Sequence, residues 1–369
     1  MTSPFEPFSR SYAEARRKFL DAAGAAGLAA TEHRHPLPGR GGETLALDVV
    51  VDGDPDATDL LIVSSGCHGV EGYCGSGVQV AALRDPAWRA AAAARGVAVV
   101  YLHALNPFGF SHLRRVTDEN VDLNRNFHDF GKPLPVNAEY RTVHPLLMPQ
   151  SWPPSPEHLA EVERVIAARS FPVFQAIVSR GQHEFPDGLF FGGTEPTWSN
   201  RTLRTVLRAV AGRAHRIAWI DLHTGLGPTG VGERIHAGPD DAAMLARSRA
   251  WWGPHVTSIY DGSSVSALLT GLMFQSVLEE CPQAEYTGIA IEYGTQPIEA
   301  MFGALTAENW LNNHPEAPEP LAAAIKQQML EAFYVDTDVW RGAVLMQARE
   351  AMQQAIDGLS GRTGLGATG

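Results

Sequence analysis

Apolar and polar positions along the chain follow two periods, one typical of buried strands and one typical of amphipathic helices. Short apolar runs bounded by turn residues predict buried strands at 60–64, 97–103, 217–222 and 289–293. Apolar residues spaced three or four positions apart predict helices at 11–29, 76–84, 86–96, 155–169 with a further turn towards Val178, 201–213 and 241–252. Strands that alternate with helices in this way predict one α/β domain with a largely parallel central sheet.

The remaining segments have less regular patterns. The stretch from about 30 to 51 is rich in proline and glycine and then alternates, which suggests an edge strand before the strand at 60–64. Residues 106–154 form a long irregular region, and such regions inside a compact domain are usually functional. The tail 360–369 is expected to be flexible. Before it, an apolar stripe predicts a closing helix: Trp340, Val344, Ala348, Met352 and Ile356.

The composition is that of a globular protein and excludes several function classes. Of the 369 residues, 44% are hydrophobic and 19% are charged, which suffices for a sizeable core without disulfides. The three cysteines, Cys67, Cys74 and Cys281, have no paired spacing, so we expect reduced thiols. A net charge of −12 argues against nucleic-acid binding, and no apolar run reaches the roughly 20 residues that span a membrane. The N-terminus lacks a basic region followed by an apolar stretch, so we expect no secretory signal and a cytoplasmic location.

Polar groups that an apolar strand has no packing reason to hold occur at three strand ends. His68 and Glu71 follow the first predicted strand, His223 follows the third, and Glu292 lies near the end of the fourth. In an open α/β sheet, ligands bind at this edge. Two histidines and a carboxylate with one open position form a usual catalytic zinc site, and zinc lowers the pKa of a bound water from about 15.7 towards ~7. Glu292 could then take the proton of that water and pass it to a leaving amine.

Each of these residues has a structural alternative. A single histidine at a strand end is more often a satisfied core residue, and Glu292 could be a surface or salt-bridged carboxylate. Four such residues at three strand ends are harder to explain by packing alone, and this favours the metal site.

A second group of polar residues lies in the irregular region. The planar guanidinium of Arg125 suits a carboxylate, and the neighbouring amide of Asn124 can add a hydrogen bond. Arg114 and Arg115 place two further cations nearby in sequence, and one of them could stabilise the oxyanion that forms when water attacks a carbonyl. Asp122 could accept the second ring N–H of a metal-binding histidine.

Six motifs therefore follow one another along the chain: His68-x-x-Glu71, Asn106-Pro107-x-Gly109-Phe110, Arg115, Asp122-Leu123-Asn124-Arg125-Asn126-Phe127, His223 and Glu292. In order and spacing they resemble the zinc carboxypeptidase superfamily. The signature Asp221-Leu222-His223-Thr224-Gly225 also resembles the deacylase branch, which includes succinylglutamate desuccinylase and aspartoacylase. The Gly-Val-Glu-Gly run after the first histidine is most similar to an uncharacterised bacterial branch of this superfamily.

The resemblance implies a single α/β/α domain with a mixed, mostly parallel central sheet. This domain would span residues 1–359, with an N-terminal helix and turns at 1–44, a catalytic core at 45–305 and C-terminal helices at 306–359. The implied partner is a small molecule or short peptide, with no nucleic acid and no membrane, while the oligomeric state stays open.

The resemblance also implies roles for the polar residues at the strand ends. One zinc ion per chain would be held by His68, Glu71 and His223. Asp122 would orient His68, and Glu292 would act as general base and acid.

On the substrate side, the resemblance implies that Arg115 polarises the scissile carbonyl and that Asn124 and Arg125 hold a substrate carboxylate. The sequence departs from the peptidase pattern here. The segment 181–193 has no counterpart in digestive carboxypeptidases, and we expect it to form either a substrate-covering loop or a tight structural turn. The tyrosine that carboxypeptidases place over the substrate cannot be assigned among three candidates: Tyr260, Tyr286 and Tyr293.

The sequence thus predicts a zinc-dependent hydrolase that cleaves an amide bond in a small substrate or short peptide with a free carboxylate. An N-acyl amino acid deacylase is the alternative within this class, because the sequence does not settle which side of the amide carries the carboxylate. A catalytically silent metal-binding protein is the alternative of another class, and the intact Glu292 and Arg115 argue against it. A serine hydrolase is disfavoured because no Gly-x-Ser-x-Gly turn stands at a strand end.

Overall fold

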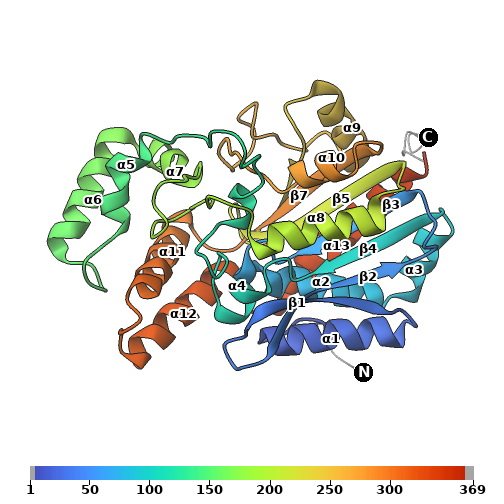
Figure 1. The fold of residues 1–369 in the computed structure, drawn as a ribbon, viewed down its shortest axis with the longest axis horizontal. Coiled ribbons are helices and arrows are strands. Elements are labelled where there is room, and N and C mark those ends of the chain that lie inside the picture. The colour runs from blue at the N-terminus through green and yellow to red at the C-terminus, as the bar shows by residue number, and fades with distance from the viewer. Residues whose placement is uncertain (1–4, 362–369) are drawn as a thin grey trace.

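A computed structural model describes residues 5–361, and its centre is one seven-stranded sheet with the order β1-β2-β4-β3-β5-β7-β6 (Figure 1). The pairings give five strands one direction and give β2 and β6 the opposite one. The predicted α/β fold with a mixed, mostly parallel sheet is confirmed. The strands are β1 (Ala30–Pro38), β2 (Thr44–Asp52), β3 (Asp59–Ser65), β4 (Val97–His103), β5 (Arg216–Gly225), β6 (Gly232–His236) and β7 (Glu285–Gly294).

The four predicted buried strands are present, as β3, β4, β5 and β7, and three further strands complete the sheet. The single edge strand expected before β3 is instead a hairpin, in which β1 is at the edge and β2 lies inside the sheet. Proline lacks the backbone donor that an inner strand needs, so the proline-containing β1 is the edge strand. At the other edge, β6 has only five residues and follows a glycine-rich stretch, which hid it from pattern analysis.

The predicted helices are also present, with small differences at their ends. Ser170, with a φ of +72°, separates α6 from α7, so the turn expected after residue 169 is an independent helix. The irregular region contains only short helices, and the predicted flexible tail lies outside the described residues from 362 onward. The helices are α1 (Tyr12–Ala25), α2 (Gly72–Leu83), α3 (Pro86–Ala93), α4 (Pro107–His112), α5 (Tyr140–Val143), α6 (Pro156–Arg169), α7 (Phe171–Ser179), α8 (Trp198–Ala211), α9 (Ala242–Trp252), α10 (Gln275–Glu280), α11 (Ile298–Asn313), α12 (Glu319–Phe333) and α13 (Asp338–Leu359), with 3₁₀ turns at Gly69–Glu71, Leu123–Arg125 and His144–Leu147.

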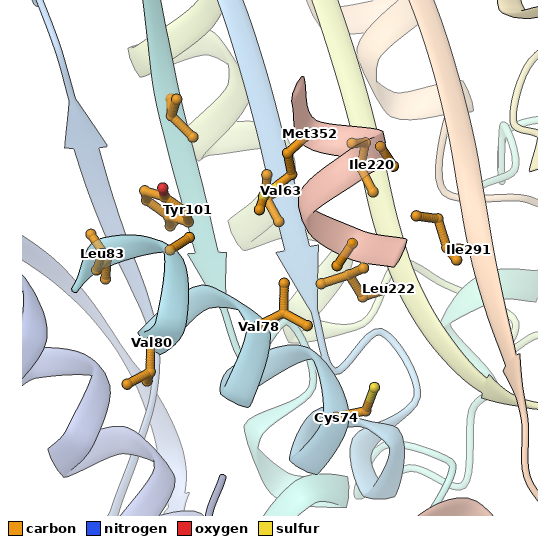
Figure 2. Packing of buried hydrophobic residues seen from close by; sticks show 14 of the residues in the cluster. Val63, Cys74, Val78, Val80, Leu83, Tyr101, Ile220, Leu222, Ile291 and Met352 are labelled. Carbon is orange, nitrogen blue, oxygen red and sulfur yellow. The ribbon is translucent and has the colours of Figure 1, made fainter. Parts of the chain in front are cut away.

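The sheet is buried on both faces because successive strand residues point to opposite sides. In β3, Leu61 and Val63 face a cluster built with α1, α2 and α13, whereas Leu60 and Ile62 face a second cluster built with α8 and α10. Figure 2 shows the first cluster, in which Val63 lies between residues of α2 and α13. Continuous apolar strands of this kind fix the positions of the polar residues at their ends.

A third hydrophobic cluster lies beside the sheet, and helices α5, α7, α11 and α12 supply most of it (left in Figure 1). It includes Val70, which lies in the 3₁₀ turn Gly69–Glu71 after β3, so this cluster borders the edge where the parallel strands end. None of the helices within residues 5–361 is both long enough and apolar enough to cross a membrane.

His103, at the end of β4, couples this core to pH. Its buried ring stacks on Phe19 with ring centroids 4.4 Å apart, and its Nε2 lies 2.9 Å from the Ser76 hydroxyl. Burial lowers the pKa of His103 to about 3, whereas an unfolded histidine titrates near a pKa of about 6.5. Between these values the unfolded chain binds a proton that the native state excludes, so stability falls as the pH drops through this window.

We expect His103→Gln to remove this acid sensitivity. Between pH 7 and pH 5, the free energy of unfolding should shift by about 2 kcal/mol in favour of the variant relative to the wild type. Urea unfolding at the two pH values measures this shift, and His255→Gln, at an exposed position, is the control. A difference between wild type and variant that does not change with pH would contradict the prediction.

Candidate metal centre

The structure brings three predicted ligand residues together at the carboxyl edge of the sheet. Ligand atoms of His68, Glu71 and His223 all lie within 4.8 Å of one another, and the side chains are at most 5% exposed. The Nδ1 atoms of the two rings are 3.2 Å apart. The Glu71 carboxylate spans them, with Oε1 2.9 Å from Nδ1 of His68 and Oε2 3.0 Å from Nδ1 of His223.

The turn after β3 fixes two of these side chains through its glycines. His68 stands immediately before the 3₁₀ turn Gly69–Glu71, and the N–H of Gly69 donates to the Arg115 carbonyl. A side chain at Gly69 would place its Cβ 2.1 Å from the backbone of Gly109. Only glycine permits this approach, which holds the histidine turn against the segment that carries Arg115.

His223 and Glu292 are fixed by strand register. They are paired residues on the parallel strands β5 and β7, so both side chains reach the same edge of the sheet. Glu292 is half-buried, and its carboxylate accepts the N–H of Leu226 at 3.0 Å. Burial, together with the charge of Glu71, raises the pKa of Glu292 to about 7.

An aspartate lies next to the outer ring nitrogen of each histidine. Asp122 Oδ1 lies 3.2 Å from Nε2 of His68, and Asp221 Oδ2 lies 2.5 Å from Nε2 of His223. At His223, the carboxylate at Nε2 favours a proton there and leaves Nδ1 as the position for a cation. Although burial opposes the charged form, Asp221 and Glu71 raise the pKa of His223 well above its usual range. A cation that binds at this ring therefore displaces a proton.

Asp221 is the residue whose role the sequence analysis missed. A buried chain of hydrogen bonds holds it: Trp219 Nε1 donates to Ser64 Oγ at 2.7 Å, and Ser64 donates to Asp221 Oδ1 at 2.6 Å. The available signal was its spacing, because an aspartate two positions before His223 in a strand lies on the same face.

Arg115 contacts this cluster directly. Its Nη1 donates to Glu71 Oε1 and its Nε donates to Asp122 Oδ2, both at 3.0 Å, and Nη2 lies 2.8 Å from Nε2 of His68. Its guanidinium also lies over the Phe190 ring, 5.2 Å from the centroid. Arg115 thus places a cation beside the three donors and faces the cavity described next.

The predicted carboxylate-binding pair, Asn124 and Arg125, lies in the turn Leu123–Arg125. Asn124 Oδ1 accepts the Met273 N–H at 2.8 Å, which leaves its amide N–H₂ for other partners. Arg125 donates Nε and Nη2 to the Ser179 carbonyl and Nη1 to the Asn124 carbonyl. Burial lowers the pKa of Arg125 to about 10, so it remains charged at neutral pH. Of its five N–H donors, these three bonds leave two.

A cavity of about 150 Å³ opens beside these residues. Two of the predicted site residues, Glu71 and Asp122, lie behind its wall. The other six line the cavity: His68, Arg115, Asn124, Arg125, His223 and Glu292. The 181–193 segment contributes Phe190 to the wall. Tyr286 also lines the cavity, but its hydroxyl donates to the Ala237 carbonyl, and those of Tyr260 and Tyr293 donate to other carbonyls.

Solved structures similar to this one include carboxypeptidases and a succinylglutamate desuccinylase/aspartoacylase. Carboxypeptidase A from Helicoverpa armigera is 12% identical, with 88% of this chain and 74% of that chain covered and a TM-score of 0.43. A metallo-carboxypeptidase from Burkholderia cenocepacia is 13% identical, with coverages of 89% and 69% and a TM-score of 0.38. The succinylglutamate desuccinylase/aspartoacylase from Rhodobacter sphaeroides is 14% identical, with coverages of 78% and 65% and a TM-score of 0.33.

Among sequence comparisons, no curated protein matches the chain. A family model described as "Protein of unknown function (DUF2817)" matches residues 8–347. Because this match spans most of the sequence, the chain belongs to the DUF2817 family.

Proposed function

We propose that this protein is a zinc-dependent hydrolase that cleaves an amide bond in a small substrate or short peptide bearing a free carboxylate. The observation that carries the proposal is the convergence of two Nδ1 atoms and one carboxylate beside a cavity, with an aspartate at the outer nitrogen of each ring.

The type and spacing of the three donors support a zinc site. Zinc binds histidine nitrogen at about 2.0–2.1 Å and carboxylate oxygen at about 2.0–2.2 Å in tetrahedral sites, so its ligand atoms lie about 3.3 Å from one another. The Nδ1 atoms of His68 and His223 are 3.2 Å apart, and each lies 2.9–3.0 Å from one oxygen of the Glu71 carboxylate. When bound, zinc would polarise the amide carbonyl and lower the pKa of water.

Glu292 handles the protons in this proposal. It faces the same cavity as His223, and a pKa near neutrality lets one carboxylate serve first as a base and then as an acid. Glu292 takes a proton from the attacking water, whose oxygen bonds to the acyl carbon. As the C–N bond breaks, Glu292 returns that proton to the leaving nitrogen and becomes a carboxylate again.

Three further residues act on the substrate. Arg115 places positive charge beside the donors, where negative charge develops on the carbonyl oxygen. The amide N–H₂ of Asn124 and the two remaining donors of Arg125 bind the substrate carboxylate. The proposal therefore assigns separate residues to proton transfer, charge stabilisation and substrate anchoring.

Metal analysis tests the donor set directly. Protein purified under zinc-replete conditions should contain about one zinc per chain, and His68→Ala and His223→Ala should each lose it. His255→Ala, at an exposed position, should keep the metal and serves as the control. A wild-type protein free of zinc, or variants that keep a full complement, would remove these residues from the metal centre.

Glu292→Gln tests the proton-transfer role separately from metal binding. The amide keeps the size of the side chain but cannot accept a proton, so kcat should fall by roughly 10²- to 10⁴-fold while the zinc content stays unchanged. Substantial residual hydrolysis by the zinc-loaded variant would exclude Glu292 as the base.

Arg125→Ala tests the carboxylate anchor. The loss of charge-assisted hydrogen bonds should raise KM for free-carboxylate substrates about 10- to 100-fold, with a much smaller effect on their amidated analogues. Because Arg125 also bonds the Ser179 carbonyl, Arg125→Lys, which keeps the cation, is measured alongside. Equal effects of Arg125→Ala on both substrate forms would contradict the anchor.

A further inference from the structure

Two groups of apolar residues that line the cavity belong to different hydrophobic clusters, and we name them the α11 lobe and the sheet lobe. The α11 lobe is formed by Phe190, Leu226, Met301, Phe302, Leu305 and Phe333, which pack with helices α7, α11 and α12. The sheet lobe is formed by Trp219, Met273, Phe274 and Tyr286, which pack with α8 and α10. The guanidinium groups of Arg115 and Arg125 lie over the Phe190 ring of the α11 lobe, and Asn124 accepts the Met273 N–H of the sheet lobe.

The α11 lobe adjoins Glu292. The Leu226 N–H binds the Glu292 carboxylate. A Cβ at Gly225 would lie 3.2 Å from Glu292 Oε1, from Met301 Sδ and from the Phe333 ring, so these three groups converge on one point. The bare backbone of Gly225 keeps this junction open.

The sheet lobe adjoins the carboxylate anchor. Asn124 binds the Met273 backbone, so a substrate carboxylate held by Asn124 lies next to this lobe. The polar atoms of the lobe are already paired, because Tyr286 donates to the Ala237 carbonyl and Trp219 donates to Ser64. The lobe therefore offers apolar surface to the part of the substrate that carries the carboxylate.

The charge of the cavity limits how many carboxylates it can accept. Among the described residues that line it, two are arginines, Arg115 and Arg125, and none is a lysine. Arg115 is already paired with Glu71 and Asp122, and the α11 lobe contains no charged side chain. A second carboxylate on the substrate would lose its water without gaining a counter-ion, which is strongly unfavourable.

We infer that the substrate has a single carboxylate and uncharged apolar groups on both sides of the amide, with the acyl side in the α11 lobe. This inference rests on the proposed function and specifies its substrate class: apolar N-acyl derivatives of apolar amino acids. The α11 lobe is lined by phenylalanine, leucine and methionine side chains, so the matching acyl groups are apolar, such as benzoyl. Acyl groups with their own carboxylate, such as succinyl, are rejected.

Hydrolysis of two leucine derivatives by the zinc-loaded protein tests the inference. We expect kcat/KM for N-benzoyl-leucine to exceed that for N-succinyl-leucine by about 100-fold or more. Equal values, or a preference for the succinyl compound, would overturn the inference and leave the proposed hydrolase function intact.

A charge introduced into the α11 lobe tests the assignment of the acyl side. Phe302 lines this lobe and is only partly buried, so Phe302→Lys should fold while supplying the missing cation. In this variant, the ratio of kcat/KM for N-benzoyl-leucine to kcat/KM for N-succinyl-leucine should fall at least 10-fold. Asn312→Lys, at an exposed position on the same helix, should leave the preference unchanged. An unchanged preference in Phe302→Lys would remove the acyl group from the α11 lobe.

Binding separates this inference from the proposed function. Calorimetry with the zinc-loaded Glu292→Gln protein should detect binding of N-benzoyl-leucine and much weaker binding of N-succinyl-leucine. If the wild type cleaves neither compound but this difference in binding remains, the hydrolase proposal fails. The inferred preference of the apolar lobes for a ligand with a single carboxylate is then retained. If neither compound binds, or both bind equally, the inference itself fails.

Discussion

The buried carboxylate of Glu71 is the constraint on which the rest of the site depends. It is 1% exposed, and an unpaired carboxylate at such a position would be strongly destabilising. Its partners come from separate parts of the chain: His68 from the same turn, Arg115 from the irregular region and the His223 ring from β5. Their positive character compensates for burial and keeps the pKa of Glu71 below its usual range. Each of these segments must therefore be placed correctly before the charge can be buried.

The sheet provides that placement because its inner strands are apolar on both faces. A slip in register would move their apolar residues out of both clusters, so the ends of β3, β5 and β7 are fixed relative to one another. The strand register also fixes the positions of the polar side chains at those ends, as the pairing of His223 with Glu292 shows. The contact of Gly69 with Gly109 extends the same order to the irregular region, which has few regular elements of its own.

The contrast between the apolar strands and the irregular region explains how much of the structure the sequence could predict. Apolar runs identified the four central strands, and polar residues at their ends stood out because packing did not require them; His68, Glu71, His223 and Glu292 do lie at one edge. Strand pattern failed for the proline-containing β1 and the short β6, where local composition resembles turns. The apolar lobes could not be predicted, because the periodicity of α11 shows that it buries a face but not that Met301 and Phe302 of that helix border a cavity.

Two adjacent arginines connect the charge cluster to the α11 lobe. Arg115 faces the cluster, whereas Arg114 pairs with buried Glu308 of α11 at 2.8 Å and donates to Asn120. Asn120 in turn donates to two backbone carbonyls of the 181–193 segment, the segment that supplies Phe190 to the cavity wall. Because a buried ion pair is costly to break from one side, this network holds the α11 lobe in a fixed relation to Arg115. The shape of the lobe and the position of the cation thus depend on one structural connection, so a change in either one disturbs the other.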